Sequence, residues 1–277
     1  MLLNLMWKAL SYYLKNSKAV ERAIDKVGNG PSKPDPTPQV LKPYRQGDYR
    51  SALTAAEVLR ENGKATTAYA FFRGSMLAQL GQFEEAETLL RKSTGTYLKG
   101  EERLLFGGLM ILAELLMQTQ RYTEAGDVID RCMVNFAEYG STYRAKAQSY
   151  LMQGVKTADA VRLAAMGVER EKKSKPDGDD QVRKLALGEC MATLAWATAV
   201  ESSNRQQVTQ LASAAVNAVG KRTACTTALV HCHLGRAFAE IGDTVQSTQH
   251  YKEAAKIDPH GLWGRDAMAA MNLAAAV

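Results

Sequence analysis

The sequence predicts an all-α fold in which helical hairpins repeat along the chain and stack into an α-solenoid. The first reason is composition: alanine, leucine and methionine favour helices, and runs of β-branched and aromatic residues typical of strands are scarce. The second reason is recurrence, since YRQGDYRSALTAAEVL, AQLGQFEEAETLLRKS and AEIGDTVQSTQHYKEA share one pattern of glycine, larger residue and small residue. The third reason is the period of that recurrence.

The period is measured between the residues that would turn one helix of a hairpin into the next. The intervals between them are 34, 39, 34, 49 and 39 residues. Two intervals are equal, two exceed them by five, and the longest contains the polar stretch KSKPDGDD. The variation therefore indicates insertions between repeated units rather than a change of the unit itself, which is typical of solenoids. The predicted turn residues are Gly47, Gly81, Gln120, Gly154, Ser203 and Gly242.

Each unit is predicted to consist of two helices that cross closely. The second helix of one unit, FEEAETLLRKS, has apolar residues at spacings of three and four, which places them on one helical face. Two helices that approach to about 8–10 Å need a small residue at the contact. We expect Gly74 to face Ala86 in this unit, and Gly235 to face Ser247 in the last one.

The chain is expected to have three parts. Residues 1–30 are predicted to form an amphipathic helix and a proline-rich joint, residues 33–261 the array of about six hairpins, and residues 262–277 a capping helix. The first helix is interrupted by Lys8 and is too short to span a bilayer, and it lacks the residue order of a secretory signal. We expect it to pack on the array or, alternatively, to lie on a membrane surface through residues 1–16.

Charge and cysteine usage restrict the function. The net charge is +6, but the basic residues are scattered among acids, which argues against binding of nucleic acid. The four cysteines have irregular spacings, which predicts free thiols in a reducing compartment. We therefore expect a cytoplasmic protein or, alternatively, a cytoplasmic protein that is peripheral to a membrane. The HCH run at 231–233 does not predict a metal site, because adjacent residues of a helix point in different directions.

Motifs of enzymes are also missing from the sequence. It contains no P-loop, no GxSxG, no HExxH and no glycine-rich dinucleotide motif, and its four histidines all lie in the last fifth of the chain. We therefore predict that the protein is not an enzyme and that it needs no cofactor.

The last unit, ALVHCHLGRAFAEIGDTVQSTQHYKEAAKIDPH, resembles the tetratricopeptide repeat, a helix–turn–helix of 34 residues. Leu234, Gly235, Gly242, Tyr251, Ala254 and Pro259 stand at family positions. The second unit is similar at Gly74, Gly81, Phe83, Ala86 and Leu90, and the third at Leu112, Ala113, Tyr122 and Ala125. The fourth and fifth units keep little beyond the hairpin period. The resemblance covers roughly residues 33–261 and implies a right-handed α-solenoid of about six repeats.

The resemblance also implies where a partner would bind. In this family the first helix of each pair lines a concave groove that holds a peptide or helix of another protein. The groove would be lined by Phe71, Ser75, Gln79, Met110, Glu114, Met117, Gln118, Arg144, Gln148 and Met152. Members that clamp a terminal carboxylate use Lys, Asn and Arg at matching positions, whereas this mixed apolar and amide set favours an amphipathic helix or extended segment. Core packing is the alternative role for the methionines.

The predicted function is therefore protein–protein interaction, as a scaffold, an adaptor or a chaperone-like subunit. One alternative is a membrane-associated assembly factor that residues 1–16 anchor. A second is an RNA-binding helical-repeat protein, which the scattered charge disfavours. Self-association into a homo-oligomer, through the groove or through the segment 261–277, is a further alternative.

Overall fold

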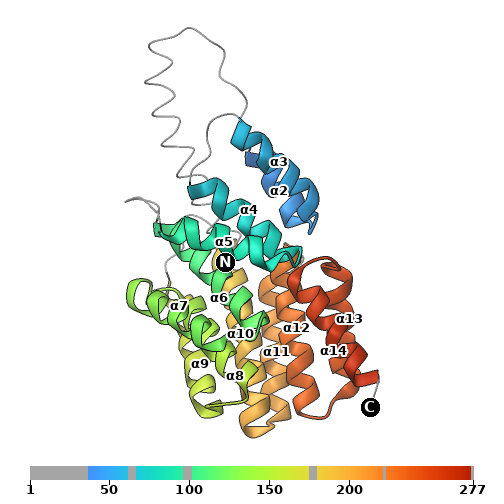
Figure 1. Cartoon of the computed structure of the whole chain (residues 1–277). Coiled ribbons are helices and arrows are strands. Elements are labelled where there is room, and N and C mark those ends of the chain that lie inside the picture. Colours follow the sequence, from blue (N-terminus) through green and yellow to red (C-terminus); the bar gives the residue numbers. More distant parts are fainter. Residues whose placement is uncertain (1–36, 62–66, 96–101, 175–179, 221–222, 276–277) are drawn as a thin grey trace.

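The computed structural model describes residues 37–61, 67–95, 102–174, 180–220 and 223–275, and within these ranges it contains helices and turns but no strand (Figure 1). The predicted all-α fold is confirmed. The predicted N-terminal helix lies outside the described residues, so its packing and the membrane alternative stay predictions.

The described helices form six hairpins followed by a single helix. The hairpins are α2 (Thr37–Arg45) with α3 (Tyr49–Glu61), α4 (Thr67–Gln79) with α5 (Phe83–Gly95), α6 (Glu102–Gln118) with α7 (Tyr122–Asn135), α8 (Gly140–Gln153) with α9 (Thr157–Lys173), α10 (Asp180–Ser202) with α11 (Arg205–Val219), and α12 (Ala224–Glu240) with α13 (Thr244–Ile257); α14 (Leu262–Ala275) follows. Consecutive hairpins pack against each other, and α14 packs against α12 and α13.

The predicted turn residues share one backbone conformation. All six have positive φ, including Gln120 at 60° and Ser203 at 49°, although neither is a glycine. This left-handed conformation ends a helix and lets the next amides bond back to it. Arg121 N, for example, donates to Leu116 O at 2.9 Å, as Asp243 N does to Phe238 O. The period in the sequence therefore marks the same turn in each hairpin.

The small residues lie at the predicted helix crossings. A Cβ atom added to Gly74 would lie 3.2 Å from Ala86 O and 3.0 Å from Leu90 Cγ. A Cβ atom added to Gly235 would lie 2.6 Å from the Tyr251 ring, and Ser247 Oγ donates to Gly235 O at 2.8 Å. Both predicted contacts are confirmed, and larger residues would force the paired helices apart.

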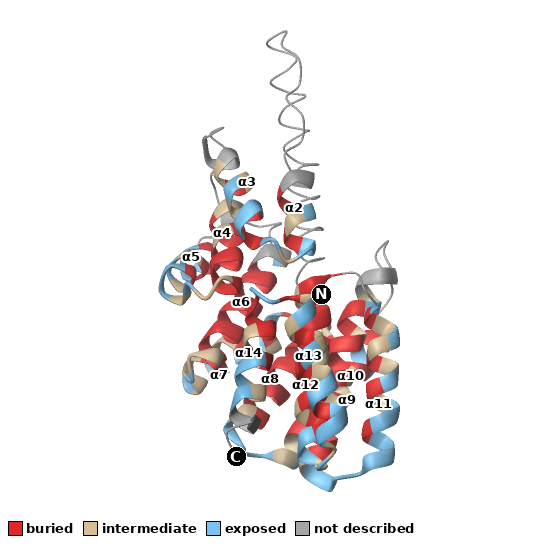
Figure 2. Cartoon of the chain, turned by 90° about the vertical axis from the view of Figure 1, so that its right-hand side faces the viewer, coloured by how far each residue is buried: buried red, intermediate tan, exposed pale blue. Residues whose placement is uncertain are grey.

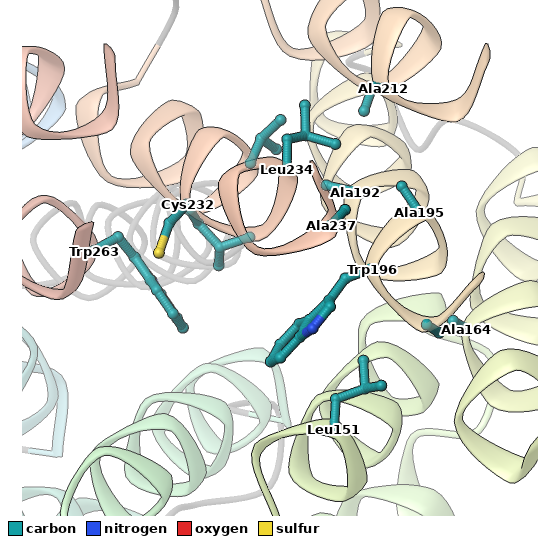
Figure 3. Packing of buried hydrophobic residues seen from close by; sticks show 14 of the residues in the cluster. Leu151, Ala164, Ala192, Ala195, Trp196, Ala212, Cys232, Leu234, Ala237 and Trp263 are labelled. Atoms are coloured by element: carbon teal, nitrogen blue, oxygen red, sulfur yellow. The ribbon is translucent and has the colours of Figure 1, made fainter. Parts of the chain in front are cut away.

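The hairpins curl into a closed arrangement rather than an open arc. Figure 2 shows buried residues on the helix faces that point inward and exposed residues on the outer sides of α11 and α14. The largest apolar cluster contains residues of the last three hairpins and of α14. Among them are Leu151 of α8, Trp196 of α10 and Trp263 of α14 (Figure 3). A second cluster contains the first two hairpins and much of α6. The two ends of the array touch, so the interior is enclosed.

Candidate partner-binding face

The predicted groove residues all lie on α4, α6 and α8, the first helices of the second, third and fourth hairpins. This surface, which we call the inner face, points into the enclosed interior. Gln118 and Met152 are half-buried, and the other eight residues are buried. The open groove expected from the sequence is therefore covered in this conformation by the chain itself. The assignment of these residues to partner binding stays a prediction, and it now requires that the interior become accessible.

The polar residues of the inner face bond to each other across helices. Arg144 Nη2 lies 2.8 Å from Glu114 Oε1, and Arg144 Nη1 donates to Gln148 Oε1 at 2.6 Å. On the other side, Arg144 Nε lies 3.6 Å from Glu189 Oε2 of α10, a residue that the sequence analysis did not single out. Burial raises the pKa of Glu114, and the neighbouring Arg144 guanidinium opposes that shift. The structure thus brings three helices together around one arginine.

The apolar residues of the inner face pack as core. Phe71 and Met117 belong to the cluster formed by the first hairpins, and Met110 belongs to a smaller cluster with Phe106 and Phe136. Met110 and Met117 therefore pack in the core in this conformation, which is the alternative role given to the methionines above. Gln148 Nε2 lies 3.7 Å from Met152 Sδ, so the polar and apolar parts of the face are in contact.

The inner face is closed where the two ends of the array meet. Tyr49 Oη donates to Asp258 Oδ2 at 2.7 Å across 209 residues of sequence. Gln79 accepts at both oxygens, from Leu262 N at 3.1 Å and from Arg265 Nη1 at 2.7 Å. We call this contact the seam. It joins residues 47–49 and 79 on one side to residues 224 and 258–265 on the other.

Asp258 is the buried acid of the seam. Burial raises its pKa to about 6, and the hydrogen bond from Tyr49 opposes the shift. Added Cβ atoms at Gly261 and Gly264 would lie 2.0 Å and 1.9 Å from Asp258, so the turn into α14 folds tightly around this residue. The resemblance to the repeat family drew attention to Pro259, whereas no role was predicted for its neighbour Asp258. Two glycines at 261 and 264, close in sequence to this acid, were the signal that could have predicted a tight turn around it.

The residues of the HCH run, 231–233, lie on α12. Their side chains point to different neighbours: His231 contacts His250, Cys232 contacts Asp266, and His233 lies between Trp196 and Trp263. Within the described part of the chain, no three His, Cys, Asp or Glu side chains are grouped so that they could hold a metal ion. The four cysteines are free thiols, as expected. Among the described helices none is long and apolar enough to cross a membrane.

Comparison with known proteins identifies the repeat. A family model described as tetratricopeptide repeat matches residues 44–96, which run from the end of α2 through the second hairpin. This part of the chain matches the tetratricopeptide repeat family. Such arrays are typically non-catalytic, and in general they are scaffolds for protein–protein interaction.

Two solved structures are similar to this chain at 15% identity. YrrB, described as a TPR protein with an unusual peptide-binding site, matches over 80% of this chain and 98% of its own, with a TM-score of 0.35. MamA MSR-1 C2 matches over 70% of this chain and 97% of its own, with a TM-score of 0.33. No curated protein matches the sequence.

Proposed function

We propose that this protein is a scaffold, adaptor or chaperone-like subunit that holds a peptide or helix of a partner on its inner face. Binding would occur in a conformation in which the seam has opened and the first hairpins have moved away from α12 and α14. We also propose that the chain has no catalytic activity of its own and works without a cofactor.

The observation that supports this proposal most is the polarity of the enclosed interior. Arg144, Glu114 and Gln148 are among the most buried residues, at 1%, 4% and 0% exposed, yet they are of the types found on surfaces. A buried ion pair stabilises a fold less than well-packed apolar residues of similar size often do. Stability alone therefore does not explain why charged and amide residues occupy the interior. A surface that contacts water and a partner in another conformation would explain these residue types.

The seam is weak enough to open on binding. Of its described hydrogen bonds, the neutral one from Leu262 N contributes roughly 0.5–1.5 kcal/mol, and those of the Asp258 carboxyl and the Arg265 guanidinium contribute roughly 1.5–3 kcal/mol each. Opening would also expose Tyr49 and Leu262, which are buried at the contact. A partner that binds only the open form can supply a free-energy difference of this size, since each tenfold of affinity is about 1.4 kcal/mol.

A reversible crosslink across the seam tests the proposal. A Cβ atom added at Gly47 would lie 3.2 Å from the Cβ atom of Ala224, so the two positions need to move apart by only a few tenths of an ångström to reach the separation of about 3.5–4.5 Å found in disulfides. We expect the Gly47→Cys/Ala224→Cys variant, in a Cys225→Ser background, to form a disulfide that holds the seam closed. Proteins retained from an extract of the source cells should be lost from the oxidised variant and regained after reduction.

The two single-cysteine variants are the matched controls. Gly47 has φ of 81°, so a cysteine there is strained whether or not the disulfide forms. Gly47→Cys alone reports that strain, and Ala224→Cys alone reports the added thiol. If the oxidised and reduced double variants retain the same partners, the inner face is not the binding surface and the proposal fails.

The membrane-associated alternative depends on the amphipathic pattern of residues 1–16, which lie outside the described residues. Self-association is likewise a prediction from the sequence alone. A cytoplasmic location stays a prediction as well.

A further inference from the structure

A cleft lies on the outer side of the seam. It has a volume of about 670 Å³ and is lined by the turn 46–50, Leu80, Pro259, His260, Arg265 and Met268. In Figure 1 this is the place where the first hairpin (blue) stands next to the turn between α13 and α14 (red). The lining residues therefore come from both ends of the array, and we call this feature the seam cleft.

The seam cleft contains an arginine, Arg265, for which no ion pair is described. Arg265 Nη1 donates to the backbone oxygens of Gln79 and His260, both at 2.7 Å. Among the described residues no carboxylate forms an ion pair with this guanidinium, and its Nε and Nη2 atoms donate no hydrogen bond there. Burial lowers the pKa of Arg265, which agrees with a charge that is partly desolvated. Two carbonyls thus orient the guanidinium without neutralising it.

The charged groups near Arg265 are one further arginine and two aspartates. Asp258 attracts Arg265 electrostatically, but it is fully buried and does not line the cleft. Arg50 lines the cleft and is exposed, and no ion pair is described for it. Asp48 is the acid of the cleft lining, and its Oδ1 atom accepts from Ser51 N at 3.1 Å, where it caps the start of α3. The lining itself thus has two guanidinium groups and one carboxylate that already has a structural partner, which favours an anionic ligand.

Apolar atoms complete the cleft. Met268 is one of the most exposed large apolar residues of the described chain, at 36%, and Leu80 is half-buried. Both line the seam cleft together with the arginines. Methionine adapts its flexible side chain to different ligands. The combination of a cationic end and an apolar wall fits a peptide in which a carboxylate stands beside an apolar side chain.

We propose that the seam cleft binds a carboxylate-bearing peptide segment of a partner protein, with the carboxylate on Arg265 and Arg50 and an apolar side chain against Leu80 and Met268. This site goes beyond the inner-face proposal, because the cleft exists while the seam is closed. A ligand that touches both ends of the array would favour the closed conformation, since it loses part of its contacts when the ends separate.

The test uses the full chain and a dye-labelled octapeptide that ends in Leu-Glu with a free carboxylate. Its partner probe has Gln in place of Glu and an amidated end. We expect the charged peptide to bind wild-type protein with a dissociation constant below about 1 mM in fluorescence anisotropy, and the neutral one about tenfold more weakly. Arg265→Met should weaken binding of the charged peptide about tenfold, and Arg50→Met about threefold.

Two variants show whether a loss of binding comes from the lost charge or from a loosened seam. Arg265 also bonds to Gln79, so its replacement could loosen the seam, whereas Arg50 is exposed and can be changed without that effect. Arg162→Met is the matched control, because Arg162 lines a different cleft between α7 and α9 and should leave binding unchanged. The proposal is wrong if Arg50→Met binds like wild type, if both peptides bind equally, or if neither binds below about 2 mM. None of these outcomes depends on opening of the inner face.

Discussion

Arg144 and Arg121 each bridge two glutamates, but one does so inside the closed array and the other on its outer surface. Arg144 lies 2.8 Å from Glu114, with side chains 1% and 5% exposed. Arg121 lies 2.6 Å from Glu87, with side chains 39% and 19% exposed. The distances are similar and the surroundings are opposite. We therefore expect the burial of a charged pair, rather than its distance, to decide what the pair contributes to stability.

The difference follows from the repeat. Arg144 lies on the buried side of α8, the first helix of its hairpin, whereas Lys146 of the same helix pairs with the exposed Asp130. Arg121 lies at the start of a second helix, and its partner Glu87 stands 34 residues earlier on the preceding second helix. Arg91 joins the same outer network through Glu87 and Glu124. The outer pairs thus link neighbouring hairpins in the presence of water, where a lost partner is replaced by solvent.

The strongest way to sharpen this comparison is to remove the inner arginine. Arg144→Met should lower the free energy of unfolding by about 3–5 kcal/mol, because Glu114 is left buried without its counter-charge. Urea unfolding followed by circular dichroism measures this. The double variant Arg144→Met/Glu114→Gln should recover part of the loss, since it also removes the buried charge. A loss no larger than that of Arg121→Met would show that water reaches the interior.

The sequence predicts the helix that carries Arg144, but it does not predict that this residue is buried. Hairpins are local objects: the spacing of apolar residues and a turn residue with positive φ specify them within one period. For this reason Gln120 and Ser203 were placed correctly although neither is a glycine.

The fifth unit shows that the period is more informative than the family residues. It keeps little of the tetratricopeptide pattern, yet α10 and α11 still form a hairpin. Its close contact uses a different small residue, since a Cβ atom at Gly188 would lie 2.3 Å from Val219 Cγ2. Helix pairing needs a small residue at the crossing, not a particular position for it.

The candidate site was harder to predict because its environment is not local. Closure depends on the summed curvature of six hairpins and on contacts such as Tyr49 with Asp258, which no pattern within one repeat encodes. The helices that carry the residues of the inner face were therefore predicted, whereas the burial of these residues was not, and their role in binding stays a prediction. Glu189 was missed because the fifth unit is aligned poorly with the family.

The seam offers an intermediate test of the comparison, because its acid is buried but has no described ion pair. The pKa of Asp258 is raised above its ordinary value of 3.8 to about 6 in the folded chain. The folded state therefore binds a proton more tightly than the unfolded state, so this group stabilises the fold at low pH and that contribution is lost as pH rises from about 4 to 6. Above about pH 7 the penalty is complete.

Asp258→Asn should remove this penalty while keeping an oxygen that accepts from Tyr49. We expect the variant to be more stable than wild type by about 1–2 kcal/mol at pH 7.5, and the gain to disappear near pH 4. Urea unfolding at several pH values measures the difference. The groups that face Asp258 are Tyr44, Tyr49, Cys225, His260 and Arg265, and all are unchanged in this comparison.

The control for this prediction is another aspartate outside the seam. Asp243 caps the start of α13 through Gln246 N, and asparagine caps helices equally well. Asp243 also pairs with the exposed Arg205 at 2.7 Å, so Asp243→Asn should lower the free energy of unfolding by no more than about 1 kcal/mol and should not give the gain expected for Asp258→Asn. If Asp258→Asn and wild type differ equally at pH 4 and pH 7.5, the buried acid is not the cause.

The smallest effect is expected on the outer surface. Arg121→Met removes the contacts to Glu87 and Glu124, but both glutamates remain in contact with water and with Arg91. We expect no measurable change in the urea midpoint at 150 mM salt and a small loss at 10 mM salt, because exposed pairs contribute little and the Debye length rises from about 8 Å at 150 mM to about 30 Å at 10 mM salt. The loss from Arg144→Met should be the same at both salt concentrations, because its pair is buried. A salt-dependent loss for Arg144→Met would mean that ions and water enter the interior, and it would remove the distinction between the two arginines.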